Sequence, residues 1–363
     1  MISSRLNAML GTALVGTSLA HAQDSTFDLQ VSMGGKDYTI SKLQNVGNVK
    51  AFSDYVGMFS NENGAFKYAE WRPTTGMQKW DLPAGFLPKD FNGKGEIYGK
   101  GNVFDPFWGK ETQQVAVYSV TGGIRGLATL PVAQENYELE STDELGNVYG
   151  FVHSTGGWRQ VRWSSGGTQV EPLELGLRYW GGHKDGSFLT NKTTGPWDPT
   201  IWFANGTQSL KLPAPTVYGY DNDGRWIGEK LVLHHGNATR NLYSLLPSTN
   251  GGHSGNSYLT LSGNGFIYGF KPQIASDPRL LENRAFLLSP TGSITDPYIV
   301  KEFVAPTKPH PYLTDVGTRI WDVSVDGSTI IYGRDYSSVP EPATWVALAF
   351  GTLALTRRRR RVA

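Results

Sequence analysis

The chain contains no cysteine, so it can form neither a disulfide bond nor a thiolate metal site. Its fold must therefore be held by a packed core alone, and 363 residues are enough to build one. Only 18% of the residues are charged, and no stretch shows the sustained apolar spacing of a capped amphipathic helix. Because glycine (44 residues) and aromatic side chains (12%) are abundant, the composition favours an all-β fold.

The N-terminus has the pattern of a signal peptide. A single basic residue, Arg5, precedes an apolar stretch from Ala8 to Ala20. In the triplet Ala20-His21-Ala22, small residues occupy the two positions that a signal peptidase recognises before its cleavage site. We expect a signal helix over residues 1–22 and cleavage at Ala20 and Ala22, with a buried N-terminal helix as the alternative.

The C-terminus combines three features in a fixed order. Val339-Pro340-Glu341-Pro342 cannot join a helix, because proline removes a donor and biases the preceding residue towards extended geometry. The apolar run Thr344–Leu355 would be about 18 Å long as a helix, which is short against a hydrocarbon core of about 30 Å. Five arginines, Arg357, Arg358, Arg359, Arg360 and Arg361, follow and favour a cytoplasmic position for this end.

This tail resembles the sorting signal of PEP-CTERM proteins, which has a Pro-Glu-Pro motif, a brief transmembrane helix and an arginine cluster. The resemblance implies export and recognition of Val339, Pro340, Glu341 and Pro342 by an exosortase-type transpeptidase. It also implies transient anchoring in the inner membrane, where the arginines stop the tail from crossing the bilayer. Transfer to the cell envelope, outer surface or extracellular matrix would follow. We therefore expect a signal peptide (1–22), a repeat domain (23–336) and a sorting segment (337–363).

The exported body is mildly acidic once both ends are removed. The whole chain has 33 basic and 32 acidic residues. Without Arg5, Arg357–Arg361 and Glu341, 27 basic and 31 acidic residues remain, a net charge of about −4. Such a body lacks the basic surface that attracts phosphate backbones, so we expect no nucleic-acid partner.

A short phrase of glycine and apolar residues recurs along the body. Regular copies occupy Gly95–Gly99, Gly146–Gly150, Gly224–Gly228 and Gly265–Gly269. Looser copies lie at Asp54–Gly57, Asp185–Thr190 and Asp326–Gly333. Seven phrases at a period near forty residues indicate propeller blades or a comparable array.

Each phrase predicts a tight turn, a short buried strand and a glycine that permits close packing or a bulge. An aromatic-ended strand and a glycine turn follow most copies, which gives three or four strands per unit. We predict a β-propeller with seven blades, six or eight being the alternatives, in preference to a β-solenoid. We expect Phe27–Leu43, with its Gly34-Gly35 turn, to complete the last blade and pair the two ends of the domain. The pattern also resembles the extracellular HAF-type repeats, a resemblance that implies no chemistry.

Most aromatic residues of the repeat occupy equivalent positions, which favours a role in packing between blades. These residues are Tyr98, Tyr149, Tyr268, Tyr332, Trp71, Trp163 and Trp202. Four tryptophans fall outside this register, in stretches that we expect to be irregular: Trp108, Trp158, Trp180 and Trp197. Exposed rings of this kind suit stacking against sugars, so these four are the candidate glycan contacts.

No metal or catalytic site stands out. Asp221-Asn222-Asp223-Gly224 resembles half of a calcium loop, but Val232 occupies the position of the twelfth-residue acid. Calcium is therefore the one cofactor considered, and we otherwise expect none. Gly252-His253-Ser254-Gly255 departs from the pattern of a serine nucleophile elbow.

These features favour a non-catalytic surface or matrix protein, either a scaffold or a module that binds glycans such as exopolysaccharide. The alternative is a glycan-active hydrolase, because propeller blades can bring two carboxyl groups together at the central channel. Two such groups about 5–9 Å apart at one end of the ring would favour the hydrolase. A deep polar pocket would instead favour binding of a small ligand.

Overall fold

The computed structural model describes residues 27–338, apart from short segments. These segments are 44–45, 63–64, 106–108, 131–135, 155–156, 173–176, 183, 193–198, 203–208, 213–216, 218, 222, 229–230, 247–257, 262–264, 275–280, 292–297 and 307–312. The predicted signal helix (1–22) and the predicted sorting segment (337–363), with its membrane helix over Thr344–Leu355, fall outside the described residues, except for Ser337 and Ser338. Within the described part, no helix is long and apolar enough to span a bilayer.

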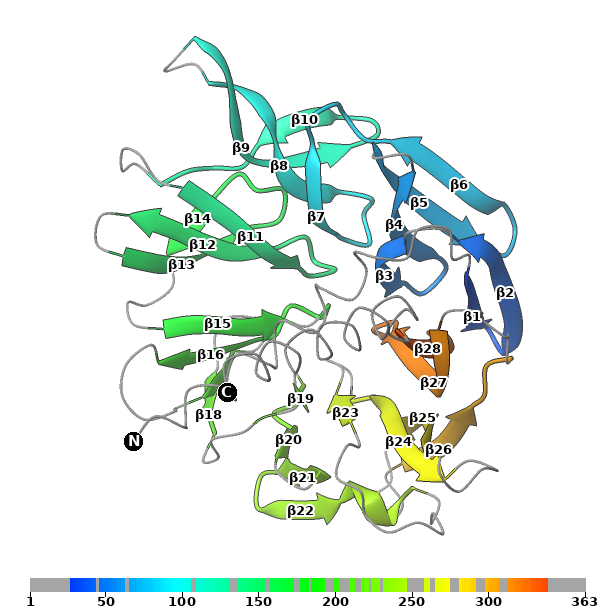
Figure 1. The fold of residues 1–363 in the computed structure, drawn as a ribbon. Coiled ribbons are helices and arrows are strands. Elements are labelled where there is room, and N and C mark those ends of the chain that lie inside the picture. Colours follow the sequence, from blue (N-terminus) through cyan, green and yellow to red (C-terminus); the bar gives the residue numbers. More distant parts are fainter. Residues whose placement is uncertain are drawn as a thin grey trace, which may run out of the picture.

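The strands pair antiparallel into four-stranded sheets, or blades, arranged around a common centre (Figure 1). Blade 1 comprises β3 (Val46–Ala51), β4 (Val56–Glu62), β5 (Ala65–Arg72) and β6 (Gly76–Asp81). Blade 2 comprises β7 (Leu87–Phe91), β8 (Ile97–Asp105), β9 (Lys110–Ser119) and β10 (Gly123–Gly126). Blade 3 comprises β11 (Asn136–Thr142), β12 (Val148–Ser154), β13 (Gly157–Trp163) and β14 (Val170–Pro172).

Blades 4 to 6 repeat this order of strands. Blade 4 comprises β15 (Leu177–Gly182), β16 (Phe188–Lys192), β17 (Thr200–Trp202) and β18 (Ser209–Lys211). Blade 5 comprises β19 (Gly219–Tyr220), β20 (Trp226–Gly228), β21 (Val232–His235) and β22 (Ala238–Asn241), followed by the 3-10 helix η2 (Leu242–Ser244). Blade 6 comprises β23 (Tyr258–Leu261), β24 (Ile267–Ile274), β25 (Leu281–Pro290) and β26 (Tyr298–Phe303).

Blade 7 joins the two ends of the domain. It comprises β27 (Leu313–Val323) and β28 (Thr329–Ser338), continued by β1 (Phe27–Met33) and β2 (Lys36–Leu43). Val31 in β1 lies opposite Ile331 in β28, so the sheet continues across the chain ends. Blades 6 and 7 touch through one parallel pair, Asn283 and Gly317. The predicted all-β propeller is confirmed, and its described strands form seven blades.

The core is divided among the interfaces between successive blades. Each of the seven interfaces has its own cluster of buried apolar side chains. Val31 of blade 7 packs with Met58 of blade 1, for example, and Tyr149 of blade 3 packs with Phe188 of blade 4. A single sheet could not bury its apolar faces, so the ring is the unit that folds.

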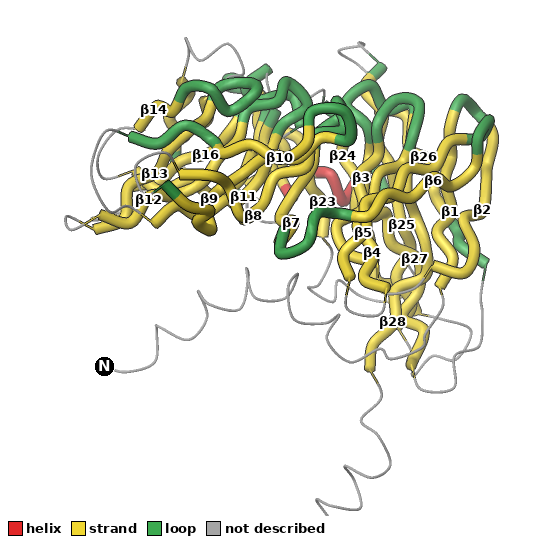
Figure 2. The backbone as a smooth tube through the Cα atoms, turned by 90° about the horizontal axis from the view of Figure 1, so that it is seen from above, coloured by secondary structure: helices red, strands yellow, loops and turns green. Residues whose placement is uncertain are grey.

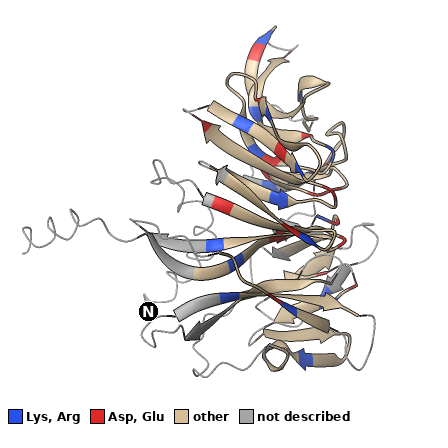
Figure 3. Cartoon of the chain, turned by 90° about the vertical axis from the view of Figure 1, so that its right-hand side faces the viewer, with Lys and Arg blue, Asp and Glu red and all other residues tan. Residues whose placement is uncertain are grey.

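The ring has two faces, and the two ends of the innermost strands distinguish them. The first strand of each blade is the innermost, and the described turns that follow these strands lie on one side, here called the turn face. The hairpins between second and third strands, such as Asp105–Lys110, lie on the opposite side, the hairpin face. Turns run along one edge of the ring in Figure 2, and β28 leaves from the other edge. Basic and acidic residues are interspersed along the strands (Figure 3).

Candidate functional site in the central channel

The turns after the innermost strands explain the recurring sequence phrase. Asn92, Asp143 and Asp221 each begin such a turn, and their side-chain oxygens accept backbone N–H groups two or four residues later. The glycine at the fourth position, Gly146 for example, has a positive φ of 91°. The phrase therefore specifies an Asx-stabilised turn with a left-handed glycine.

Repeated tyrosines connect these turns from one blade to the next. The Tyr98 hydroxyl lies 3.4 Å from the carbonyl oxygen of Gly146, and the Tyr149 hydroxyl lies 3.3 Å from that of Gly186. Both rings are buried, as are Trp71, Trp163 and Tyr332. Tyr268 and Trp202 are half-buried against neighbouring clusters. The predicted role of these aromatics in blade packing is confirmed.

Five of the described innermost strands carry β-bulges. The register shifts within β3, β7, β11, β15 and β27. The residues left without a partner in the register are Asn48, Lys89, Glu140 and Trp180 in the first four strands, and Val316 and Trp321 in β27. Asn48 Nδ2 donates to the Lys89 carbonyl at 2.8 Å, so the first two bulges adjoin. A bulge residue leaves the regular ladder and re-aims its side chain, which makes these positions candidates for ligand contact.

Trp321, one of the two tryptophans at these bulges, has an exposed side chain. It is 40% exposed, and its indole nitrogen approaches to 3.2 Å the point where Gly333 would carry a Cβ atom. The Arg319 guanidinium lies 5.0 Å from the centre of its ring. The indole thus lies over the glycine that closes the phrase of blade 7, with a cation beside it.

The four predicted glycan contacts have different positions. Trp108 and Trp197 lie outside the described residues. Trp158 and Trp180 lie in β13 and β15, so the expectation of irregular stretches was wrong for both. Trp158 pairs with His153 across a regular hairpin, whereas Trp180 is the bulge residue of blade 4. Only Trp180 shares its position with Trp321.

A lysine ties the innermost strands of blades 1 to 3 together. Lys50 Nζ lies 2.6 Å from Asp90 Oδ1 and donates to the Phe91 carbonyl at 2.9 Å. Asp90 Oδ2 accepts the backbone N–H of Thr142 at 2.8 Å. Asp90 and Thr142 are buried, so this network replaces the water that these polar groups lose.

A second lysine crosses the channel at the turn face. Lys184, in the turn after β15, donates to the carbonyls of Ala51 at 2.7 Å and Val323 at 3.1 Å. It also forms an ion pair with Asp322, which accepts the Ala51 N–H at 2.7 Å. Lys184 belongs to blade 4, whereas its partners belong to blades 1 and 7 on the opposite side of the ring. This end of the channel is therefore bridged by a charged side chain.

Glu144 lies beside this bridge. Its backbone N–H donates to the Lys184 carbonyl at 2.7 Å. Its Oε1 atom is buried and has no hydrogen-bond partner among the described residues. Burial raises the pKa of the carboxyl to about 7, although the nearby Lys184 ammonium opposes this shift. Glu144 is thus a carboxyl group that can hold a proton near neutral pH.

The calcium hypothesis for Asp221 stays a prediction. Asp221 is buried, and its Oδ2 accepts a hydrogen bond from Arg225 Nε at 2.5 Å. Its Oδ1 accepts the backbone N–H groups of Asp223 and Arg225. A cation would have to displace the Arg225 guanidinium from this carboxylate. Across the described part of the chain, no three acidic or histidine side chains are grouped to hold a metal.

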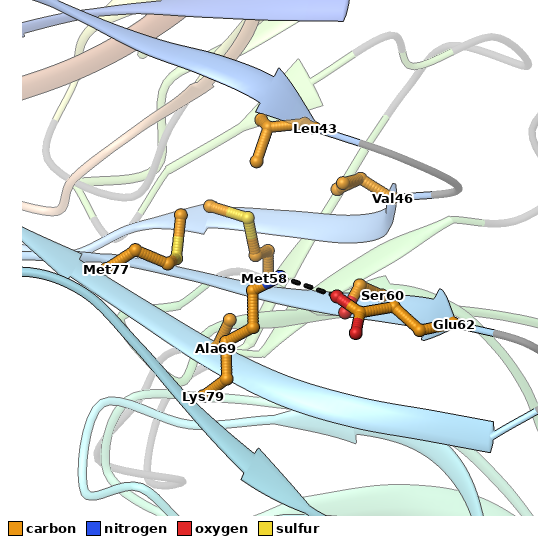
Figure 4. A pocket seen from close by; sticks show the side chains of 8 residues that line it. All are labelled: Leu43, Val46, Met58, Ser60, Glu62, Ala69, Met77 and Lys79. Atoms are coloured by element: carbon orange, nitrogen blue, oxygen red, sulfur yellow. Dashed lines mark hydrogen bonds and ion pairs between the residues drawn. The ribbon is translucent and has the colours of Figure 1, made fainter. Parts of the chain in front are cut away.

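A separate small hollow lies in blade 1 where it meets blade 7. It has a volume of about 60 Å³ and is lined mainly by apolar side chains, with polar groups at one side (Figure 4). Its lining residues are Leu43, Val46, Met58, Ser60, Glu62, Ala69, Met77 and Lys79. The Glu62–Lys79 ion pair stands beside the buried Ser60 hydroxyl. At the size of a few water molecules, the hollow is too small for a sugar ring.

Sequence reasoning missed Glu144, Lys184 and Trp321. Glu144 and Lys184 share a signal, because each occupies the second position of the turn that follows an innermost strand. Aligning the repeats by their glycines would have revealed two opposite charges at one equivalent position. The sequence gives no comparable sign that Trp321 is exposed, because the place of this residue in the strand depends on a bulge.

Comparison with known proteins identifies the tail. Residues 338–361 match the PEP-CTERM protein-sorting motif. The chain thus carries a signal for export and for sorting to the cell surface, recognised by an exosortase. No curated protein matches the chain.

Several solved structures resemble the chain at low sequence identity. The β-propeller domain of the Trilobed protease from Pyrococcus furiosus is 7% identical, with a TM-score of 0.42, over 84% of this chain and 98% of that one. TolB from Acinetobacter baumannii is 9% identical, with a TM-score of 0.36, and the match covers 86% of this chain and 64% of TolB. An acylaminoacyl peptidase from Pyrococcus horikoshii is 10% identical, with a TM-score of 0.43, and the match covers 76% of this chain and 48% of the peptidase.

Proposed function

We propose that this chain, delivered to the cell surface by its PEP-CTERM motif, is a non-catalytic matrix module that binds exopolysaccharide at its central channel. The observation that carries the proposal is Trp321, a 40% exposed indole on an innermost strand of a tightly packed ring. Aromatic faces bury apolar area while keeping a polar edge available, which suits the faces of sugar rings. Trp180 occupies the equivalent bulge in blade 4 and is the second proposed contact.

The state of the channel carboxylates supports a non-catalytic role. Asp90 is engaged by Lys50 and Thr142, and Asp322 is engaged by Lys184 and the Ala51 N–H. These bonds connect different blades, so the charges stabilise the ring. A glycosidase needs its two carboxyl groups free to transfer a proton and to activate water or attack the sugar.

One observation favours a hydrolase as the second candidate. Glu144 has a pKa near 7 and stands close enough to Asp322 for the two carboxyl groups to interact electrostatically. A carboxyl group whose pKa is raised towards neutral is the usual proton donor of glycoside hydrolysis. In that case Glu144 would be the proton donor.

The test measures binding of the secreted protein to exopolysaccharide purified from the producing cells. We expect Trp321→Ala to weaken binding at least about tenfold, the loss of roughly one stacking contact of 1–2 kcal/mol. Phe104→Ala is the matched control, because Phe104 is 62% exposed at the rim, far from the channel. Equal affinity of all three proteins would refute the binding site. Release of reducing ends by the wild type, abolished in Glu144→Gln, would favour the hydrolase.

A further inference from the structure

Both ends of the folded domain lie on the hairpin face. In β28 the chain runs from the turn Ser324–Ser328 to Ser338, and β1 runs back alongside it, from Phe27 towards the turn face. The pairs Gln30–Tyr332 and Met33–Thr329 fix this antiparallel arrangement. Ser338, after which the sorting tail begins, therefore lies on the hairpin face, at the end of β28 (Figure 2).

The tether between the domain and the predicted membrane segment is short. Five residues, 339–343, separate Ser338 from the apolar run that starts at Thr344. Six Cα–Cα steps span at most about 20 Å when fully extended. By comparison, β28 has 10 residues and is about 33 Å long. The tether cannot run back along β28, so it cannot bring the turn face to the membrane.

We propose that the full chain docks on the lipid bilayer with its hairpin face inward and presents its turn face outward. The Lys184 bridge and Glu144 would then lie at the outer mouth of the channel. The inference uses the sorting tail alone and does not depend on polysaccharide binding, so either proposal can fail without the other.

Exposed apolar residues on both faces allow a matched test. Leu145 and Val120 lie in turns on the turn face and are 49% and 50% exposed. Phe104 and Val304 lie at strand ends on the hairpin face and are 62% and 64% exposed. Because the chain has no cysteine, each Cys substitution introduces a single thiol.

The experiment compares thiol labelling by a maleimide attached to polyethylene glycol. Each full-length variant is measured in detergent and in protein-free vesicles of phosphatidylethanolamine and phosphatidylglycerol. We expect labelling of Phe104→Cys and Val304→Cys to slow several-fold in vesicles, whereas Leu145→Cys and Val120→Cys keep their detergent rates. Equal slowing on both faces, slowing of the turn face alone, or no slowing would overturn the orientation.

A longer tether provides the control. A flexible Gly/Ser insert of about 20 residues after Ser338 adds roughly 25 Å of mean reach. We expect this insert to restore labelling at Phe104→Cys and Val304→Cys towards the detergent rate. Unchanged protection would show that the short tether is not what holds the face to the bilayer.

Discussion

At the scale of single residues, the most unusual group is the Glu144 carboxyl. Its pKa is raised to about 7 by burial, while Lys184 and Lys50 lower it and Asp322 and Asp326 raise it further. The folded protein therefore keeps this group protonated over a pH range in which the unfolded chain ionises. Since the folded state binds the extra proton, stability falls as pH rises from about 4.5 to 7.

Replacing the carboxyl by an amide removes this pH dependence. The shift corresponds to at most about 3 kcal/mol, reduced to roughly 1–2 kcal/mol by solvent screening of a partly exposed group. We expect Glu144→Gln to match the wild type near pH 4 and to exceed its unfolding free energy at pH 8. Urea unfolding followed by circular dichroism between pH 4 and 8 measures this. The exposed Glu138→Gln is the control and should leave the profile unchanged.

At the scale of single elements, the closing glycines of blades 2 and 3 lie against the backbone of the innermost strand. A Cβ atom on Gly150 would lie 2.1 Å from the Glu138 carbonyl oxygen, and one on Gly99 would lie 2.2 Å from that of Leu87. Both glycines pair with the innermost strand next to its bulge. The expectation that this glycine permits close packing is therefore confirmed.

Gly150→Ala should consequently be costly. The added methyl group meets the backbone, which can yield only by moving the strand, so we expect a loss of about 1–3 kcal/mol in unfolding free energy. Gly47→Ala is the matched control, because a Cβ atom at this strand glycine meets nothing within 4 Å. Thermal and urea unfolding of both variants measure the effect. A loss that is the same for the two would contradict the steric explanation.

At the scale of the whole molecule, stability depends on closing the ring. β1 and β2 cover the edge of β28 that would otherwise be open, and they bury Val31 against blade 1. Lys184 adds a second closure by joining blade 4 to blades 1 and 7 across the channel. Both devices connect segments that are more than a hundred residues apart.

Lys184→Met should therefore destabilise the ring as a unit. The variant leaves Asp322 without its cation and two carbonyl oxygens without this donor, so we expect a loss of about 2–3 kcal/mol with one cooperative transition. Arg162→Met removes the Arg162–Glu171 pair at the surface and should cost no more than about 0.5 kcal/mol. Calorimetry distinguishes these results. A loss at Lys184 as small as at Arg162 would show that the bridge contributes nothing.

The sequence by itself determined what depends on neighbouring residues. Turns, short strands and their repetition follow from Asp/Asn-x-x-Gly and apolar residues a few positions apart, so the propeller and its closure by Phe27–Leu43 could be predicted. The sorting motif is likewise linear. Tertiary structure alone decided the site, because Trp321 emerges at a bulge, and Lys184 meets Asp322 across 138 residues. Such contacts exist only once the ring closes, and local sequence carries no information about them.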